Sequence, residues 1–209
     1  MLDVHPPHSP THTWKDFFIH IATIVIGLLI AVSLEQAVEV IHHRHSAADA
    51  RASIQKETSD NLEVLHYNLQ SLARGRQQLE TSLDALNSNA TDADVLTHLQ
   101  YKWELHKERD TAWQAARIDG SLALIPSAQL SAANYFYGSN ENLTSTVFAY
   151  FAEVDTAAAI VDHARGTGTV SAAERQQLLS RTVSALGYLR LLTRLYEYRV
   201  RAAEEVHLQ

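Results

Sequence analysis

Residues 17–34 form an apolar run, FFIHIATIVIGLLIAVSL, in which His20 is the only side chain that can carry a charge. Eighteen helical residues rise about 27 Å, close to the thickness of the hydrocarbon core of a bilayer. Soluble helices rarely contain so long an uncharged run. We therefore predict a transmembrane anchor helix over residues 13–41, which leaves residues 42–209 on one side of a membrane.

Two other interpretations of this run stay open. A buried helix of a soluble protein can be equally apolar. A cleaved signal peptide is also an apolar segment near the N-terminus. The tripeptide Ala31-Val32-Ser33 has the small–x–small form of a cleavage site. However, the first fourteen residues contain no Lys or Arg, and the run is longer than a usual signal-peptide core. These two features favour the anchor.

The small and polar residues of the predicted anchor recur at spacings of three, four, four and four, which places them within about 120° of one helix face. They are His20, Thr23, Gly27, Ala31 and Glu35, and we call them the anchor stripe. Small residues four apart allow a second helix to approach closely, and polar groups at membrane depth favour a protein-facing position. The stripe predicts packing against another transmembrane subunit or a second copy. Alternatively, His20 and Glu35 extend to the two membrane surfaces.

A heptad pattern follows the anchor, with alternating spacings of three and four that only Arg76 interrupts. Its leucines are Leu62, Leu65, Leu69, Leu72, Leu79, Leu83 and Leu86. No Gly or Pro lies between residues 28 and 74, so the anchor helix can continue into this coiled-coil-like seam. We expect the seam to pack against later helices of the same chain in an antiparallel bundle. Pairing with a second copy is the alternative.

The rest of the chain also favours helices, because it contains only 4 Pro and 7 Gly among 209 residues. We predict helices over about 92–117, 127–137, 142–165 and 172–207. Ser171 and Glu174 form the sequence pattern of a capping box at the start of the last one. Residues 1–12 are rich in Pro and His and are predicted to be disordered. The predicted fold class is therefore all-α.

Composition excludes several classes of function. The net charge is −7 and no basic patch is present, so nucleic acid is not an expected partner. The absence of cysteine excludes disulfides, a catalytic thiol and thiolate metal sites. Neither a phosphate-binding glycine loop nor a nucleophile elbow occurs. We expect a protein that is not an enzyme and has no cofactor.

The densest group of candidate metal ligands follows the anchor and comprises Glu39, His42, His43 and His45. On a helix, residues three or four apart share a face and can chelate Zn or Cu. Histidines at a membrane boundary also serve simply as titrating interfacial groups. A metal- or haem-binding redox accessory protein is therefore only an alternative hypothesis.

Three segments resemble a family of uncharacterised bacterial single-pass membrane proteins. They are WKDFFIHIATIVIGLLIAVSLEQAVEVIHHRH, ARASIQKETSDNLEVL and AWQAARIDGSLALIPSAQLSAANYFYG. The resemblance covers about residues 13–140 and implies a bacterial inner-membrane anchor with a helical, periplasmic domain of unknown function. It implies no catalytic or cofactor residue. The sparse basic residues around the anchor weakly favour the cytoplasm instead.

Taken together, these features predict a membrane-anchored helical protein that acts by association. We expect it to be an accessory subunit or scaffold of a membrane complex. Its predicted partners are the lipid bilayer and other transmembrane subunits or its own copy. A second hypothesis is a ligand-sensing input domain that signals through a partner.

Overall fold

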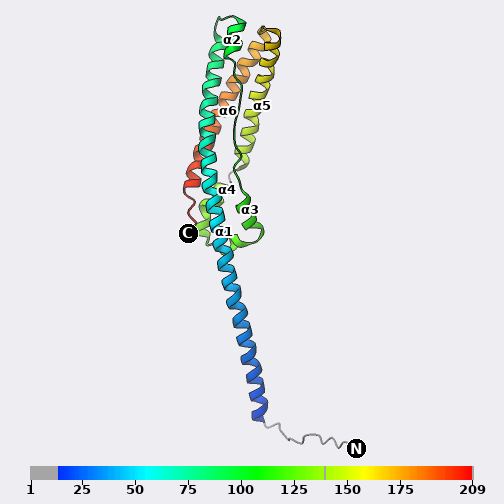
Figure 1. The fold of residues 1–209 in the computed structure, drawn as a ribbon, viewed down its shortest axis with the longest axis vertical. Helices are drawn as coiled ribbons and strands as arrows, with labels where there is room; N and C mark the ends of the chain where they lie inside the picture. Colours follow the sequence, from blue (N-terminus) through cyan, green and yellow to red (C-terminus); the bar gives the residue numbers. More distant parts are fainter. Residues whose placement is uncertain (1–13, 139, 209) are drawn as a thin grey trace, which may run out of the picture. The chain divides into compact units, whose positions relative to one another are not determined.

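A computed structural model describes residues 14–138 and 140–208, and every regular element within them is a helix (Figure 1). The elements are α1 (Trp14–Asn87), α2 (Asp92–His98), α3 (Thr111–Ile118), the 3-10 helix η1 (Ser121–Leu124), α4 (Ser127–Gly138), α5 (Asn140–Thr167) and α6 (Ala172–Glu204). The predicted all-α class, with a long N-terminal helix that packs against later helices, is confirmed. The predicted disordered tail over residues 1–12 lies outside the described residues.

The chain divides into two compact units, Met1–Ser46 and Ala47–Gln209. This division falls a few residues after the boundary that we predict between residues 41 and 42. The described part of the first unit, residues 14–46, is a single helical stretch whose side chains are almost all exposed. Among the described residues, only α1 is long and apolar enough to cross a membrane. Its apolar window has a mean hydropathy of 2.6 and none of it is buried.

In the second unit, the remainder of α1 packs with α5 and α6. The connection between α5 and α6 turns at Gly168, whose φ of 74° is a left-handed conformation that favours glycine. The predicted capping box is present, since the Ser171 hydroxyl accepts from the Glu174 amide and the Glu174 carboxylate accepts from the Ser171 amide. α6 then runs antiparallel to α1 (Figure 1).

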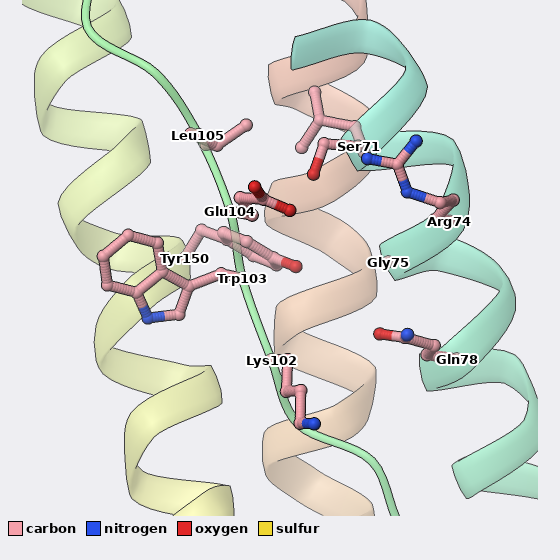
Figure 2. A pocket seen from close by; sticks show the side chains of 10 residues that line it. Ser71, Arg74, Gly75, Gln78, Lys102, Trp103, Glu104, Leu105 and Tyr150 are labelled. Carbon is pink, nitrogen blue, oxygen red and sulfur yellow. The ribbon is translucent and has the colours of Figure 1, made fainter. Parts of the chain in front are cut away.

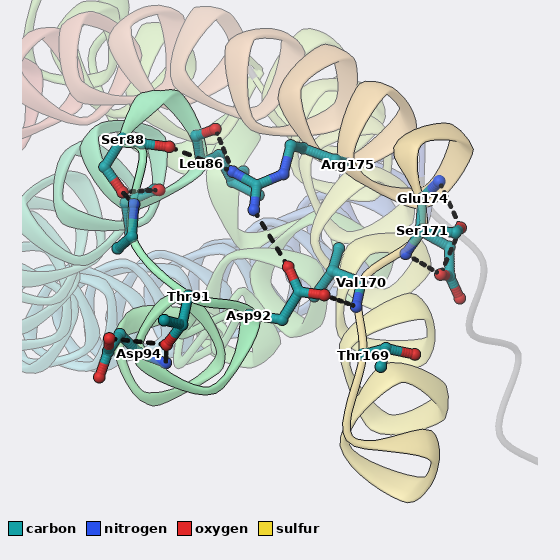
Figure 3. Close-up of polar contacts among 12 residues, drawn as sticks. Leu86, Ser88, Thr91, Asp92, Asp94, Thr169, Val170, Ser171, Glu174 and Arg175 are labelled. Atoms are coloured by element: carbon teal, nitrogen blue, oxygen red, sulfur yellow. Dashed lines mark hydrogen bonds and ion pairs between the residues drawn. The ribbon is translucent and has the colours of Figure 1, made fainter.

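Polar contacts fasten α1, α2 and α6 at one end of this bundle (Figure 3). The guanidinium of Arg175 on α6 donates to the carbonyl of Leu86, 2.8 Å away, near the end of α1. It also donates to Asp92 at the start of α2, at 3.3 Å. The second carboxylate oxygen of Asp92 accepts from the amide of Val170 at 3.0 Å. These bonds join the connection between α1 and α2 to the connection between α5 and α6 and to the first turn of α6.

The predicted helix over residues 92–117 is wrong. α2 ends at His98, and residues 99–110 form an extended segment, which we call the strap, before α3 begins at Thr111. Figures 1 and 2 show the strap running between α1 and α5. Side chains of α1 hydrogen-bond to the backbone of the strap and to the start of α3. Glu57, for example, is buried and accepts from the amides of Ala112 and Trp113, at 2.8 and 3.4 Å, where α3 starts.

Candidate functional site

The anchor stripe lies on an open face of the first unit. His20, Gly27, Ala31 and Glu35 are exposed, and a Cβ added at Gly27 would meet no described atom within 4 Å. Thr23 satisfies its own hydroxyl, which donates to the carbonyl of Ile19 at 2.9 Å. The stripe therefore has no partner among the described residues.

The candidate metal ligands do not gather into a site. Glu39 and His43 approach each other, with 3.8 Å between the carboxylate oxygen and Nε2. His42 and His45 are exposed on the same helix and no contact joins them to this pair. Within residues 14–138 and 140–208, no group of three or more His, Asp or Glu residues is arranged to hold a metal ion.

The heptad leucines of α1 separate into two sets. Leu65, Leu72, Leu79 and Leu86 are buried in the core, with exposed fractions of 2 % or less. The other three are only half-buried: Leu62, Leu69 and Leu83. The second buried column of α1 is instead polar or small and also repeats every seven residues. It contains Asn61, Asn68, Gly75 and Ser82.

Two asparagines of this second column bind the strap through its backbone. The side-chain amide of Asn61 donates to the carbonyl of Arg109 at 2.6 Å and accepts from its amide at 2.7 Å. Asn68 makes the same pair of bonds to His106, both at 2.8 Å. Each side chain thus offers a donor and an acceptor to one residue, as a neighbouring β-strand does.

Helix α1 and the strap stay in register because seven residues of the helix are about as long as three residues of the strap. Seven helical residues rise about 10.5 Å, and three extended residues span about 10 Å. The steps from Asn61 to Asn68 and from Arg109 to His106 have these lengths. Ser82 continues the series, since its hydroxyl accepts from the amide of Gln100 at 3.1 Å and donates to the carbonyl of His98 at 3.3 Å.

At Gly75 the series has no side chain, and a pocket of about 280 Å³ lies there between α1, the strap and α5 (Figure 2). Trp103 forms one wall because its ring stacks on Phe151 of α5 at 3.7 Å and its Nε1 donates to Asp155 at 2.9 Å. The polar residues that line the pocket are Ser71, Arg74, Gln78, Lys102, Glu104 and Tyr150. We call this cavity the Gly75 pocket.

Tyr150 is the most buried polar group at this pocket, with 2 % of the residue exposed. Its hydroxyl lies against Gly75 and points towards the cavity in Figure 2. No hydrogen bond joins that hydroxyl to another described side chain or backbone group. Burial raises the pKa of Tyr150 to about 12, so the hydroxyl is a neutral donor at physiological pH.

A second cavity, of about 490 Å³, lies beside a neighbouring part of the strap. Its apolar lining comes mainly from α5 and includes Leu143, Val147, Phe148 and Phe151. The strap contributes Leu105, which also lines the Gly75 pocket. The strap therefore lines both cavities, of which the Gly75 pocket has the greater share of polar groups.

No protein-family model, curated protein or solved structure matches the chain. The sequence signal for the Gly75 pocket is weak but present. Asn61, Asn68 and Ser82 repeat the Leu65–Leu72–Leu79 spacing with polar residues, and Gly75 occupies the one position of that series without a side chain. The heptad prediction assigned the second column to leucines and so missed these residues.

Proposed function

We propose that this protein is a non-enzymatic, membrane-anchored helical protein that acts by association, as an accessory subunit or scaffold of a membrane complex. The observation that carries the proposal is the anchor stripe, an unpartnered face on a helix long and apolar enough to span a bilayer. The resemblance to single-pass bacterial proteins supports an inner-membrane location with the helical domain in the periplasm.

The chemistry of the stripe specifies the kind of partner. At Gly27 and Ala31 a second helix can approach until the two backbones are in contact, because no large side chain separates them. His20 and Glu35 each offer a polar group, which in a bilayer is best satisfied by another protein. The proposed partner is therefore a transmembrane helix, either of another subunit or of a second copy of this chain.

The test is a mild-detergent pull-down of the tagged full-length protein from its native membrane, followed by native mass spectrometry. We expect a defined assembly, and we expect Gly27→Leu to lower its yield while circular dichroism of the protein stays unchanged. Val25→Leu is the matched control, since it also adds bulk but lies on the opposite face of the helix. Partner subunits in the assembly would identify an accessory subunit, and a homo-oligomer would identify a self-assembling scaffold. A monomer without partners, or a Gly27→Leu variant that assembles normally, would contradict the proposal.

A further inference from the structure

We propose that the Gly75 pocket binds a small organic carboxylate. Three observations carry this inference: a missing position in the series of side chains that hold the strap, an unpartnered tyrosine hydroxyl that opens onto the resulting cavity, and a pair of cations without ion-pair partners on the same lining. The inference does not depend on what the anchor stripe binds.

The cavity exists because residue 75 is glycine. By the register of Asn68 with His106, an asparagine at position 75 would meet the backbone of Trp103. With glycine there, the amide and carbonyl of Trp103 make no hydrogen bond to another described residue. Even one added methyl group is tight, since a Cβ at Gly75 would lie 3.2 Å from the Tyr150 hydroxyl oxygen.

The Tyr150 hydroxyl gives the pocket a fixed donor. It is carried by α5 on a residue that is 2 % exposed, it opens onto the cavity, and it has no partner among the described residues, so a ligand or an ordered water there would satisfy it. An oxyanion is a stronger acceptor than a neutral group, and hydrogen bonds to it are shorter and stronger. The hydroxyl is therefore suited to one carboxylate oxygen.

The charges on the lining favour a monoanion. Glu104 is already engaged, because it accepts from the Tyr67 hydroxyl. Arg74 lies over the Tyr67 ring, 5.8 Å from its centroid, and forms no ion pair with a described carboxylate. Lys102 likewise has no ion-pair partner among the described residues. Two cations against one carboxylate leave a net charge of +1, which matches one carboxylate.

Charge and the apolar wall separate a carboxylate from inorganic phosphate. The planar guanidinium of Arg74 can donate to two oxygens of either anion at once. The nearby Glu104 repels both anions, and it repels a phosphate dianion more strongly than a carboxylate monoanion. The volume of about 280 Å³ lies just below the usual range of drug-sized ligand sites, and Leu72 and Leu105 offer an apolar wall for a short carbon chain.

The test uses the purified full-length protein in detergent micelles, titrated calorimetrically with acetate, propionate, butyrate and lactate, and separately with inorganic phosphate. We expect saturable, one-to-one binding of at least one carboxylate, which phosphate does not displace. No saturable binding by any of the four acids, or stronger binding of phosphate, would overturn the proposal.

Variants locate the site. Tyr150→Phe and Arg74→Gln should each weaken carboxylate binding about tenfold, the effect of losing one hydrogen bond to a charged group. Arg76→Gln is the matched control, since Arg76 is exposed, pairs with Glu80 on α1 and does not line the pocket. If circular dichroism shows that Tyr150→Phe is unfolded, the carboxylate affinity of Arg74→Gln tests the site, since Arg74 is exposed and its replacement should leave the fold intact. Carboxylate affinity that is unchanged in Arg74→Gln, or reduced equally in Arg76→Gln, would place the ligand elsewhere and contradict the inference.

Discussion

The side chain of Asn68 makes both backbone hydrogen bonds of His106, donating to its carbonyl and accepting from its amide at 2.8 Å each. One side chain on a helix thus offers a donor and an acceptor to the backbone of an extended residue, as a neighbouring strand does in a sheet. Asn61 repeats the arrangement three strap residues further on, at Arg109. This pairing explains how residues 99–110 can be extended without a neighbouring strand, since side chains of α1 satisfy backbone groups of the strap.

Replacing Asn68 should therefore destabilise the second unit. Asn68→Ala removes both hydrogen bonds of a fully buried amide, and we expect a loss of about 2 kcal/mol in the free energy of unfolding. Urea denaturation measures this loss, and hydrogen exchange should show the amide of His106 less protected. Asn87→Ala is the control, since that exposed amide bonds only within its own helix, to Leu83. Equal losses in the two variants would mean that the strap is held by other contacts.

A second prediction concerns the ion pair between α6 and the strap. Arg199 is buried, donates through Nε to Glu108 at 3.0 Å and through Nη1 to the carbonyl of Phe136 at 3.0 Å. Arg199→Met leaves the carboxylate of Glu108 nearly buried without its partner, which should cost about 3–5 kcal/mol in unfolding experiments.

The double variant Arg199→Met with Glu108→Gln distinguishes two contributions to this loss of stability: the missing contacts of Arg199 and the unpaired charge of Glu108. It removes the uncompensated charge, so we expect most of the lost stability to return. A single variant as stable as the parent protein, or a double variant no better than Arg199→Met, would show that Glu108 is well solvated without the arginine.

Sequence periodicity predicted the all-α class and the start of α6, because both depend on local signals such as heptads and the Ser171–Glu174 capping box. It did not predict the strap. Residues 99–110 have no Pro or Gly to break a helix. Their extended form depends on Asn61 and Asn68, which are distant in the sequence. The Gly75 pocket was missed for the same reason, since it exists only where the strap passes α1.

The two leucine sets of α1 give a third prediction. Leu79 is 2 % exposed, whereas Leu83 is only half-buried, although both belong to the predicted seam. Leu79→Ala should cost about 3 kcal/mol through lost burial and a cavity, and Leu83→Ala about 1 kcal/mol. Urea denaturation of the two variants compares them directly. Equal costs would favour a seam in which Leu83 also packs, as in pairing with a second copy.

Acid stability should depend on Glu174. Hydrogen bonds from Ser171, with a smaller effect of His163, lower the pKa of Glu174 from 4.5 to about 2. The unfolded chain therefore takes up a proton first as the pH falls, and the contribution of Glu174 to stability is lost between about pH 4.5 and pH 2. Glu174→Gln should lack this part of the pH dependence in thermal unfolding. A carboxyl resonance of Glu174 that titrates near pH 4.5 in the folded protein would contradict the prediction.

Alkaline stability should depend on buried tyrosines in the opposite sense. Burial raises the pKa values of Tyr150 and Tyr196 from 10.0 to about 12. Their contribution to stability is complete below about pH 10, and it is lost as the pH rises towards 12, because the unfolded chain releases these protons first. Absorbance at 295 nm, recorded with circular dichroism, should show part of the tyrosine ionisation coinciding with loss of helix. Tyr150→Phe should reduce that part, whereas Tyr198→Phe, at an exposed ring, should not. Complete ionisation near pH 10 with the helices intact would mean that water reaches both hydroxyls in the folded protein.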